Sequence, residues 1–100
     1  MTSIKIHLKT FLEGVVSRET GAILRNQIID YLRQYDSIDI DFKELTLTPS
    51  FADEAFGLLC HHLTRQDFNE RVKIHHLTEP QKVLLTHVIG NRYQKSTHIR

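Results

Sequence analysis

The chain has 100 residues, of which 40% are hydrophobic and 25% charged, and its formal net charge is +1. This length suits one domain, and the composition is that of an ordinary soluble globular protein. The small net charge excludes a general attraction to nucleic acid or anionic lipid. The sequence shows no run of transmembrane length, no signal-peptide core and one cysteine, Cys60, so that an internal disulfide is excluded. We therefore expect a cytoplasmic protein that makes no contact with a membrane.

Three short segments alternate between apolar and polar residues, the pattern of a strand with one buried face. They are residues 4–9, 37–42 and 72–77. Residues 10–16, TFLEGVV, permit a further short strand in a hairpin with the first.

Three other segments show helical patterns, at residues 17–35, 50–66 and 78–90. The first contains Gly21, which costs about 1 kcal/mol in a helix interior and so indicates close approach of another backbone. Gly90 is predicted to end the last helix. Residues 67–71 are expected to form a polar connection.

The order of these elements predicts the fold class. Alternating strands and helices favour parallel pairing with right-handed crossovers. Parallel strands covered on both faces would be apolar throughout, whereas these alternate. We therefore predict an α/β two-layer sandwich, with a mostly parallel sheet of three to five strands and all helices on one face. Residues 1–91 form this domain, and residues 92–100 form a polar tail.

The other face of the sheet is expected to carry charged side chains. Asp39 and Asp41 lie about 7 Å apart along one strand, too far for one tight cation site without other ligands. Solvation, or pairing with lysines of neighbouring strands, is the simpler interpretation.

Certain stretches within this order are similar to a known family. SRETGAILRNQI, IDIDFKEL and PSFADEAFGLL, between Ser17 and Leu59, resemble the STAS-like domains of unknown function. These are distant relatives of the sulphate-transporter and anti-sigma-factor-antagonist STAS domains. The resemblance implies a small sheet covered by helices, no catalytic chemistry, no cofactor and a role in bacterial signalling by binding other proteins. In the antagonists a kinase partner phosphorylates a serine at a strand-to-helix corner, and Ser50 occupies the comparable corner here, although the Ser-Gly-Leu pattern is absent.

Ser50 has two further interpretations from the residues alone. Its hydroxyl can cap the helix, with Asp53 at the spacing of an acidic capping box. Alternatively, the free N–H groups of the helix start can bind an anion, such as the phosphate of a nucleotide. Asp53 and Glu54 in the first turn oppose a phosphate there.

The remaining candidates for chemistry are weak. Asp53 and Glu54 are adjacent on a helix, so they diverge and do not form an acid–base pair. The histidines at 61, 62, 75 and 76, with Cys60, lack the spacing of a zinc site, so no metal is expected. Three cations in the tail, without acidic neighbours, are too few to predict nucleic-acid binding.

We therefore predict a non-enzymatic regulatory module that binds a protein partner, such as a kinase, a phosphatase or another regulator. The alternative is a small-ligand sensor that binds a nucleotide at the Ser50 helix start. Arg18 is expected either to pair with Asp41 or Glu54 or to be solvated, and the oligomeric state is left open. The residues predicted to line the recognition surface are Arg18, Ser50, Phe51, Asp53 and Glu54, with Phe51 as a partly exposed anchor.

Overall fold

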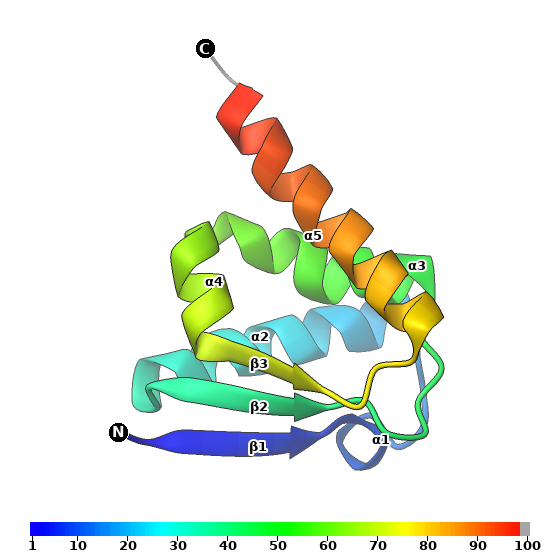
Figure 1. Ribbon diagram of the computed structural model, residues 1–100. Helices are drawn as coiled ribbons and strands as arrows, with labels where there is room; N and C mark the ends of the chain where they lie inside the picture. The colour runs from blue at the N-terminus through cyan, green and yellow to red at the C-terminus, as the bar shows by residue number, and fades with distance from the viewer. Residues whose placement is uncertain (99–100) are drawn as a thin grey trace.

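Three short strands form one parallel sheet in the order β1-β2-β3 (Figure 1). The structure is a computed structural model that describes residues 1–98, with side chains up to Gln94. Strand β1 spans Ser3–His7, β2 spans Ser37–Asp41 and β3 spans Val72–His75. Ile40 of β2 stands in register with an isoleucine on each neighbour, Ile6 and Ile74. Side chains of the three strands therefore form rows that face the same way.

One face of this sheet is apolar and the other polar, as predicted. Ile6, Ile38 and Ile40 are at most 4% exposed. Lys73 and His75, at alternate positions of β3, are exposed. Figure 1 shows the main helices stacked on one side of the sheet, with the helix that ends the described chain outermost. The predicted α/β fold with helices on one face is confirmed.

The first long helix, α2 (Arg18–Gln34), begins with a reciprocal cap. The Thr20 backbone N–H donates to Ser17 Oγ at 3.2 Å, and the Ser17 N–H donates to Thr20 Oγ1 at 2.9 Å. Two donors that would otherwise lack partners are thereby satisfied. The buried stripe of α2 is Gly21, Leu24, Ile28 and Leu32.

The second predicted helix is real but changes its hydrogen-bond pattern along its length. It consists of α3 (Pro49–Ala52), the π-helical η1 (Asp53–Gly57) and the 3₁₀ segment η2 (Leu58–His61). In η1 the Leu58 N–H donates to the Asp53 carbonyl, five residues back. The helix ends at His61, earlier than the predicted residue 66.

The predicted helix cap at Ser50 is wrong. Thr48 is the N-cap, and its Oγ1 accepts from the Phe51 N–H at 3.3 Å. The reason is Pro49, which has no N–H and a fixed φ, and therefore suits the first helical position. Ser50 lies in the second.

Two other segments differ from their predictions. A short helix, α1 (Leu8–Phe11), follows β1 directly in place of the possible hairpin. The predicted polar connection at 67–71 is part of α4 (Arg65–Arg71), which Thr64 caps by accepting from the Asp67 N–H at 3.0 Å. Phe68 is the buried residue of α4.

The last helix, α5 (Glu79–His98), continues through Gly90, where its end was predicted. Tyr93 is buried, and its hydroxyl donates to the Leu63 carbonyl at 3.1 Å. The predicted tail, residues 92–100, extends beyond the described residues. Among residues 1–98, no helix has both the length and the apolarity that a membrane crossing requires.

Gly21 lets α2 and the second helix approach closely, as its sequence position indicated. A Cβ at Gly21 would lie 3.1 Å from both the Phe51 carbonyl oxygen and Glu54 Cβ. At Gly90, by contrast, a Cβ would meet nothing within 4 Å. The two helical glycines therefore provide a matched pair for testing this contact.

We expect Gly21→Ala to lower the free energy of unfolding by about 1 kcal/mol, because a crowding penalty of about 1–3 kcal/mol exceeds the gain in helix propensity. Gly90→Ala should raise the free energy by up to about 1 kcal/mol, since only the propensity changes. Urea unfolding measures both. A Gly21→Ala variant as stable as the wild type would show that the two helices do not pack this closely.

Candidate functional site

The N-terminal ends of α2 and α3 lie at the same end of the molecule, close to the carboxyl ends of the strands (Figure 1). We use the name corner surface for five residues there: Arg18, Arg25, Ser50, Asp53 and Glu54. Four of them were predicted as site residues. The fifth, Arg25, is brought to Glu54 by the close packing at Gly21.

Glu54 is the centre of the corner surface. Its Oε2 lies 2.9 Å from Arg25 Nη1 and its Oε1 lies 3.2 Å from Arg18 Nη1. Arg25 also donates to the Glu54 backbone carbonyl. The hydrogen bond from Arg25, followed by that from Arg18, lowers the pKa of Glu54 below its ordinary value. Of the two predicted partners for Arg18, the structure therefore selects Glu54.

Asp53 points elsewhere, although it is adjacent to Glu54 in sequence. Arg92 Nη2 lies 2.9 Å from each of the two Asp53 carboxylate oxygens. The two carboxylates thus contact different helices, α5 and α2, and do not face one another. This divergence is the one expected for adjacent positions on a helix.

Ser50 is exposed in the first turn of α3. With Thr48 as the cap, the Ser50 hydroxyl has no hydrogen bond to another described residue. Residues four apart on a helix are surface neighbours, so Ser50 lies about one turn before Glu54. The serine is therefore accessible beside a carboxylate that two arginines hold.

Phe51 does not belong to this surface. Its side chain is 0% exposed and lies in the hydrophobic core, so the prediction of a partly exposed anchor is wrong. Because Thr48 and Pro49 start the helix earlier than predicted, Phe51 is its third residue and faces the sheet side.

A second cluster, at the carboxyl edge of the sheet, was missed by the sequence analysis. Asp41 is 6% exposed, and its Oδ1 lies 2.8 Å from His76 Nδ1. Its Oδ2 lies 3.5 Å from His7 Nδ1 and 4.0 Å from Lys5 Nζ. The pKa of Asp41 is lowered, chiefly because its carboxylate accepts the Lys43 backbone N–H at 2.9 Å.

The Asp41 cluster occupies the edge at which parallel sheets bind ligands. That rule, applied to the last residue of β2, was the signal that could have found it. The lysine pairing predicted for Asp41 is present with Lys5. The contact with His76 involves a residue whose backbone is left-handed, φ 63°, which the sequence does not reveal. Through the hydrogen bond that it accepts from the Lys43 backbone N–H, Asp41 supports the loop after β2.

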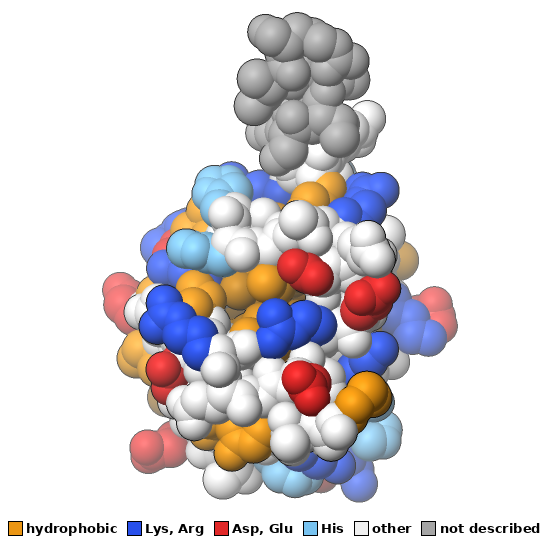
Figure 2. Space-filling view, turned by 90° about the vertical axis from the view of Figure 1, so that its left-hand side faces the viewer, with side chains coloured by type: hydrophobic (Ala, Val, Ile, Leu, Met, Phe, Trp, Pro, Cys, Tyr) orange, Lys and Arg blue, Asp and Glu red, His pale blue; other side chains and the backbone are white. Residues whose placement is uncertain are grey.

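A small hollow of about 270 Å³ lies at the C-terminal end of α2. Figure 2 shows apolar, basic and histidine side chains together on this side of the molecule. Arg71, which lines the hollow, donates to the carbonyls of Leu32, Tyr35 and Asp36 at 2.5, 3.0 and 2.9 Å. This arginine therefore satisfies the free carbonyls at the end of α2, and its role is structural.

Metal and thiol chemistry find no support in the described part of the chain. Among residues 1–94, whose side chains are described, no three His, Cys, Asp or Glu side chains are grouped as metal ligands would be. Cys60 is buried, its Sγ donates to the Phe56 carbonyl, and burial raises the pKa of the thiol. A raised thiol pKa disfavours the nucleophilic thiolate.

The ion pairs of Glu54 should make the stability depend on pH. Because its pKa in the folded state lies below its ordinary value of 4.5, ionised Glu54 stabilises the fold above that pH. The contribution is lost as the pH falls through the lowered pKa. Glu54→Gln should therefore reduce the free energy of unfolding at neutral pH and flatten its decline in acid, as measured by urea unfolding from about pH 7 to 3.

Glu19→Gln is the matched control, since Glu19 is an exposed glutamate in the first turn of α2. Its profile should follow that of the wild type. In both variants the free energy of unfolding still declines somewhat in acid, because the pKa of Asp41 is also lowered. Parallel curves for Glu54→Gln and the wild type would contradict the prediction.

A comparison with known protein families identifies the family to which this fold belongs. The family model of the STAS-like domain of unknown function (DUF4325) matches residues 20–82, from the first turn of α2 to the start of α5. Ser50, Asp53 and Glu54 lie within the match, and Arg18 lies just before it. No curated protein and no solved structure matches the chain. Because the match spans more than half of the residues, the chain belongs to the family of STAS-like domains of unknown function.

Proposed function

We propose that this domain is a non-enzymatic regulatory module that binds a protein partner through the corner surface, and that phosphorylation of Ser50 weakens this binding. The observation that carries the proposal is the position of Ser50. It is exposed and lies one turn before Glu54, which Arg18 and Arg25 hold.

A phosphate on Ser50 would act through charge. It adds about −1.5 to −2 charges and three acceptor oxygens. Glu54 would be repelled, and Arg18, whose side chain is 62% exposed, is free to turn towards the phosphate. Arg25 is only 17% exposed and stays with Glu54. Modification would thus rearrange the exposed half of the network and leave the buried half in place.

The electrostatics of the two carboxylates support binding rather than catalysis. A general acid or base works best with a pKa near the working pH. The lowered pKa of Glu54 keeps it ionised at neutral pH, and both Asp53 and Glu54 already accept hydrogen bonds from arginines. They are better suited to contacting cationic groups of a partner than to exchanging protons.

A photo-crosslinking amino acid at position 50 should give one discrete adduct with a partner in the native cell. The same amino acid at position 73, exposed on the polar face of the sheet, should not give that adduct. With the partner identified, phosphoserine at position 50 should weaken binding about tenfold or more, because one to three charge-assisted contacts rearrange.

Arg18→Glu should also weaken binding to that partner, whereas Lys73→Glu should leave it unchanged. If positions 50 and 73 gave the same adducts, or phosphoserine at 50 left the affinity unaltered, the corner surface would not be the recognition surface.

The second interpretation, a nucleotide sensor, has less support from the geometry. Thr48 Oγ1 already accepts from the Phe51 N–H, one of the donors that an anion would use. Glu54, one turn after Ser50, would repel a phosphate.

We therefore expect nucleoside mono-, di- and triphosphates to leave the melting temperature of the protein unchanged. A ligand at one hundred times its Kd would stabilise the fold by about 2.7 kcal/mol, which corresponds to a shift of roughly 10 °C or more for a domain of this size. A concentration-dependent rise that is lost in Ser50→Asp would instead establish the sensor.

A further inference from the structure

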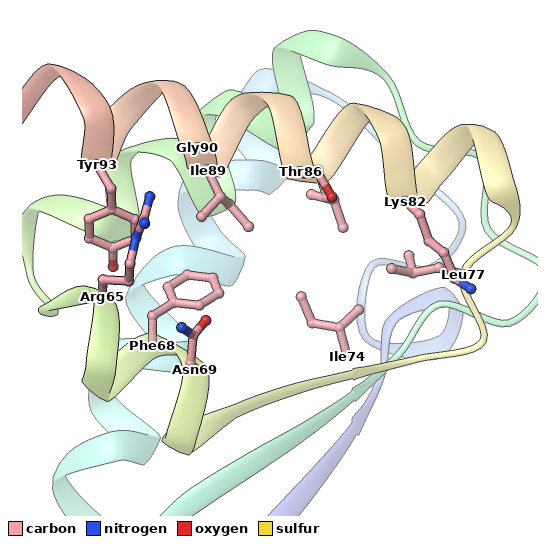
Figure 3. Close-up of a pocket in the computed structure, with 11 residues that line it drawn as sticks. Arg65, Phe68, Asn69, Ile74, Leu77, Lys82, Thr86, Ile89, Gly90 and Tyr93 are labelled. Atoms are coloured by element: carbon pink, nitrogen blue, oxygen red, sulfur yellow. The ribbon is translucent and has the colours of Figure 1, made fainter.

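An apolar hollow lies away from the corner surface, between α4, β3 and α5 (Figure 3). It measures about 450 Å³, within the range of ligand-binding pockets. We call it the β3 groove. Phe68, Ile74 and Ile89 point into it from the three elements that form its walls.

In the part of the chain that the structure describes, the β3 groove is bordered by an edge of the sheet to which no further strand is added. Strand β3 is the last in the order β1-β2-β3. The His75 carbonyl accepts from Phe42 N–H on the β2 side, at 3.0 Å. Alternate residues of a strand direct their backbone groups to opposite sides. The N–H and C=O of Ile74 therefore point away from β2, along the open edge beneath the groove.

The charges at the β3 groove have one sign. Of the described residues that line it, the charged ones are Arg65 and Lys82, and they stand at its two ends (Figure 3). Arg65 lies over the ring of Tyr93, 5.5 Å from its centroid. Lys82 Nζ lies 3.4 Å from Glu79 Oε1, but that glutamate side chain is 84% exposed, so the pair contributes little. Both cations can meet an incoming carboxylate.

From this combination we propose that the β3 groove binds an extended peptide segment of a partner protein, which adds to β3 as a further strand. The segment has apolar side chains that enter the groove and carboxylates that meet Arg65 and Lys82. An exposed strand edge supplies affinity through backbone hydrogen bonds, and the neighbouring pocket supplies specificity. This site is separate from the corner surface and does not depend on the function proposed for it.

The spacing of the cations sets the length of the peptide. Lys82 and Tyr93, over which Arg65 lies, are 11 positions apart on α5. At 1.5 Å per residue this corresponds to about 16 Å. A strand rises about 3.3 Å per residue, so carboxylates four to six positions apart bracket that distance. Two apolar side chains fit between carboxylates six positions apart, on the same side of the strand.

The probe is a set of terminally blocked heptapeptides with glutamate at the first and last positions. Threonine occupies the even positions, and positions three and five carry all combinations of valine, isoleucine, leucine and phenylalanine. We expect at least one member to bind in fluorescence anisotropy and to shift the backbone amide resonances of residues 72–76. The counterpart with lysine at both ends should bind about threefold to tenfold more weakly, as expected for the loss of two exposed ion pairs.

Two protein variants provide a matched comparison. Lys82→Glu should weaken the binding of the peptide with terminal glutamates and strengthen the binding of the peptide with terminal lysines, because the charge at one end of the groove is reversed. Lys73→Glu makes the same change of charge on the opposite face of the sheet. It should change the affinity for either peptide by no more than about twofold. Circular dichroism is the control that tests whether both variants are folded.

Backbone methylation separates strand addition from simple pocket filling. N-methylation of one alternate set of peptide amides should abolish binding, while methylation of the other set is tolerated, since only one side of the peptide faces β3. The proposal is overturned if no member binds at millimolar concentration, if the two methylated sets behave alike, or if Lys73→Glu and Lys82→Glu have equal effects. It is also overturned if sedimentation shows a dimer whose interface protects residues 72–76, because a second copy then fills the groove.

Discussion

The rest of the structure depends on the one-sidedness of the sheet. Buried isoleucines of β1 and β2 face the helices, and burying each aliphatic side chain contributes about 1.5–3 kcal/mol. The opposite face carries charged and polar side chains such as Asp39, whose Oδ1 lies 2.8 Å from Nε2 of His75. A helix placed on that face would have to desolvate these charges, so the long helices collect on the apolar side.

Because the long helices share one side of the sheet, they pack on it in successive layers. Helix α2 contacts the sheet directly, and α3 with η1 packs against it where Gly21 removes the side chain. Helix α5 then packs on α3, η1 and η2. This outermost helix covers the core only in part, and the β3 groove is the uncovered remainder between α5 and the edge of the sheet.

The sequence predicted the features that repeat locally. The period of two identified all three strands and the buried face of the sheet, because that pattern is independent of neighbouring elements. Ser17 and the apolar stripe predicted α2 for the same reason. Gly21 predicted a close helix contact. For Arg18 the sequence left open pairing with Asp41, pairing with Glu54 or solvation, and the structure shows the pair with Glu54. The corner surface was therefore largely accessible from sequence.

Features that depend on tertiary contacts could not be predicted in this way. Helix α4 has one buried residue, Phe68, and so shows no helical stripe. Helix α5 passes through Gly90 because Tyr93, on the next turn, is anchored in the core. The position of Phe51 was mistaken because the proline before Ser50 was not used, although Pro49 marks the first helical position and so places the cap at Thr48.

Asp53 and Glu54 show why the second helix can hold a π turn at its centre. A π turn is rarer than an α turn and needs support from its surroundings. Glu54 is tied to α2 through Arg18 and Arg25, and Asp53 to α5 through Arg92. The turn is thus held from two sides by neighbouring carboxylates that point apart. Gly57 fits the same arrangement, because a Cβ there would lie 2.4 Å from Asp53 Oδ1 and would displace the carboxylate from Arg92. The acidic pair therefore holds together the layer that presents Ser50, and the corner surface owes its shape to α5 as well as to α2.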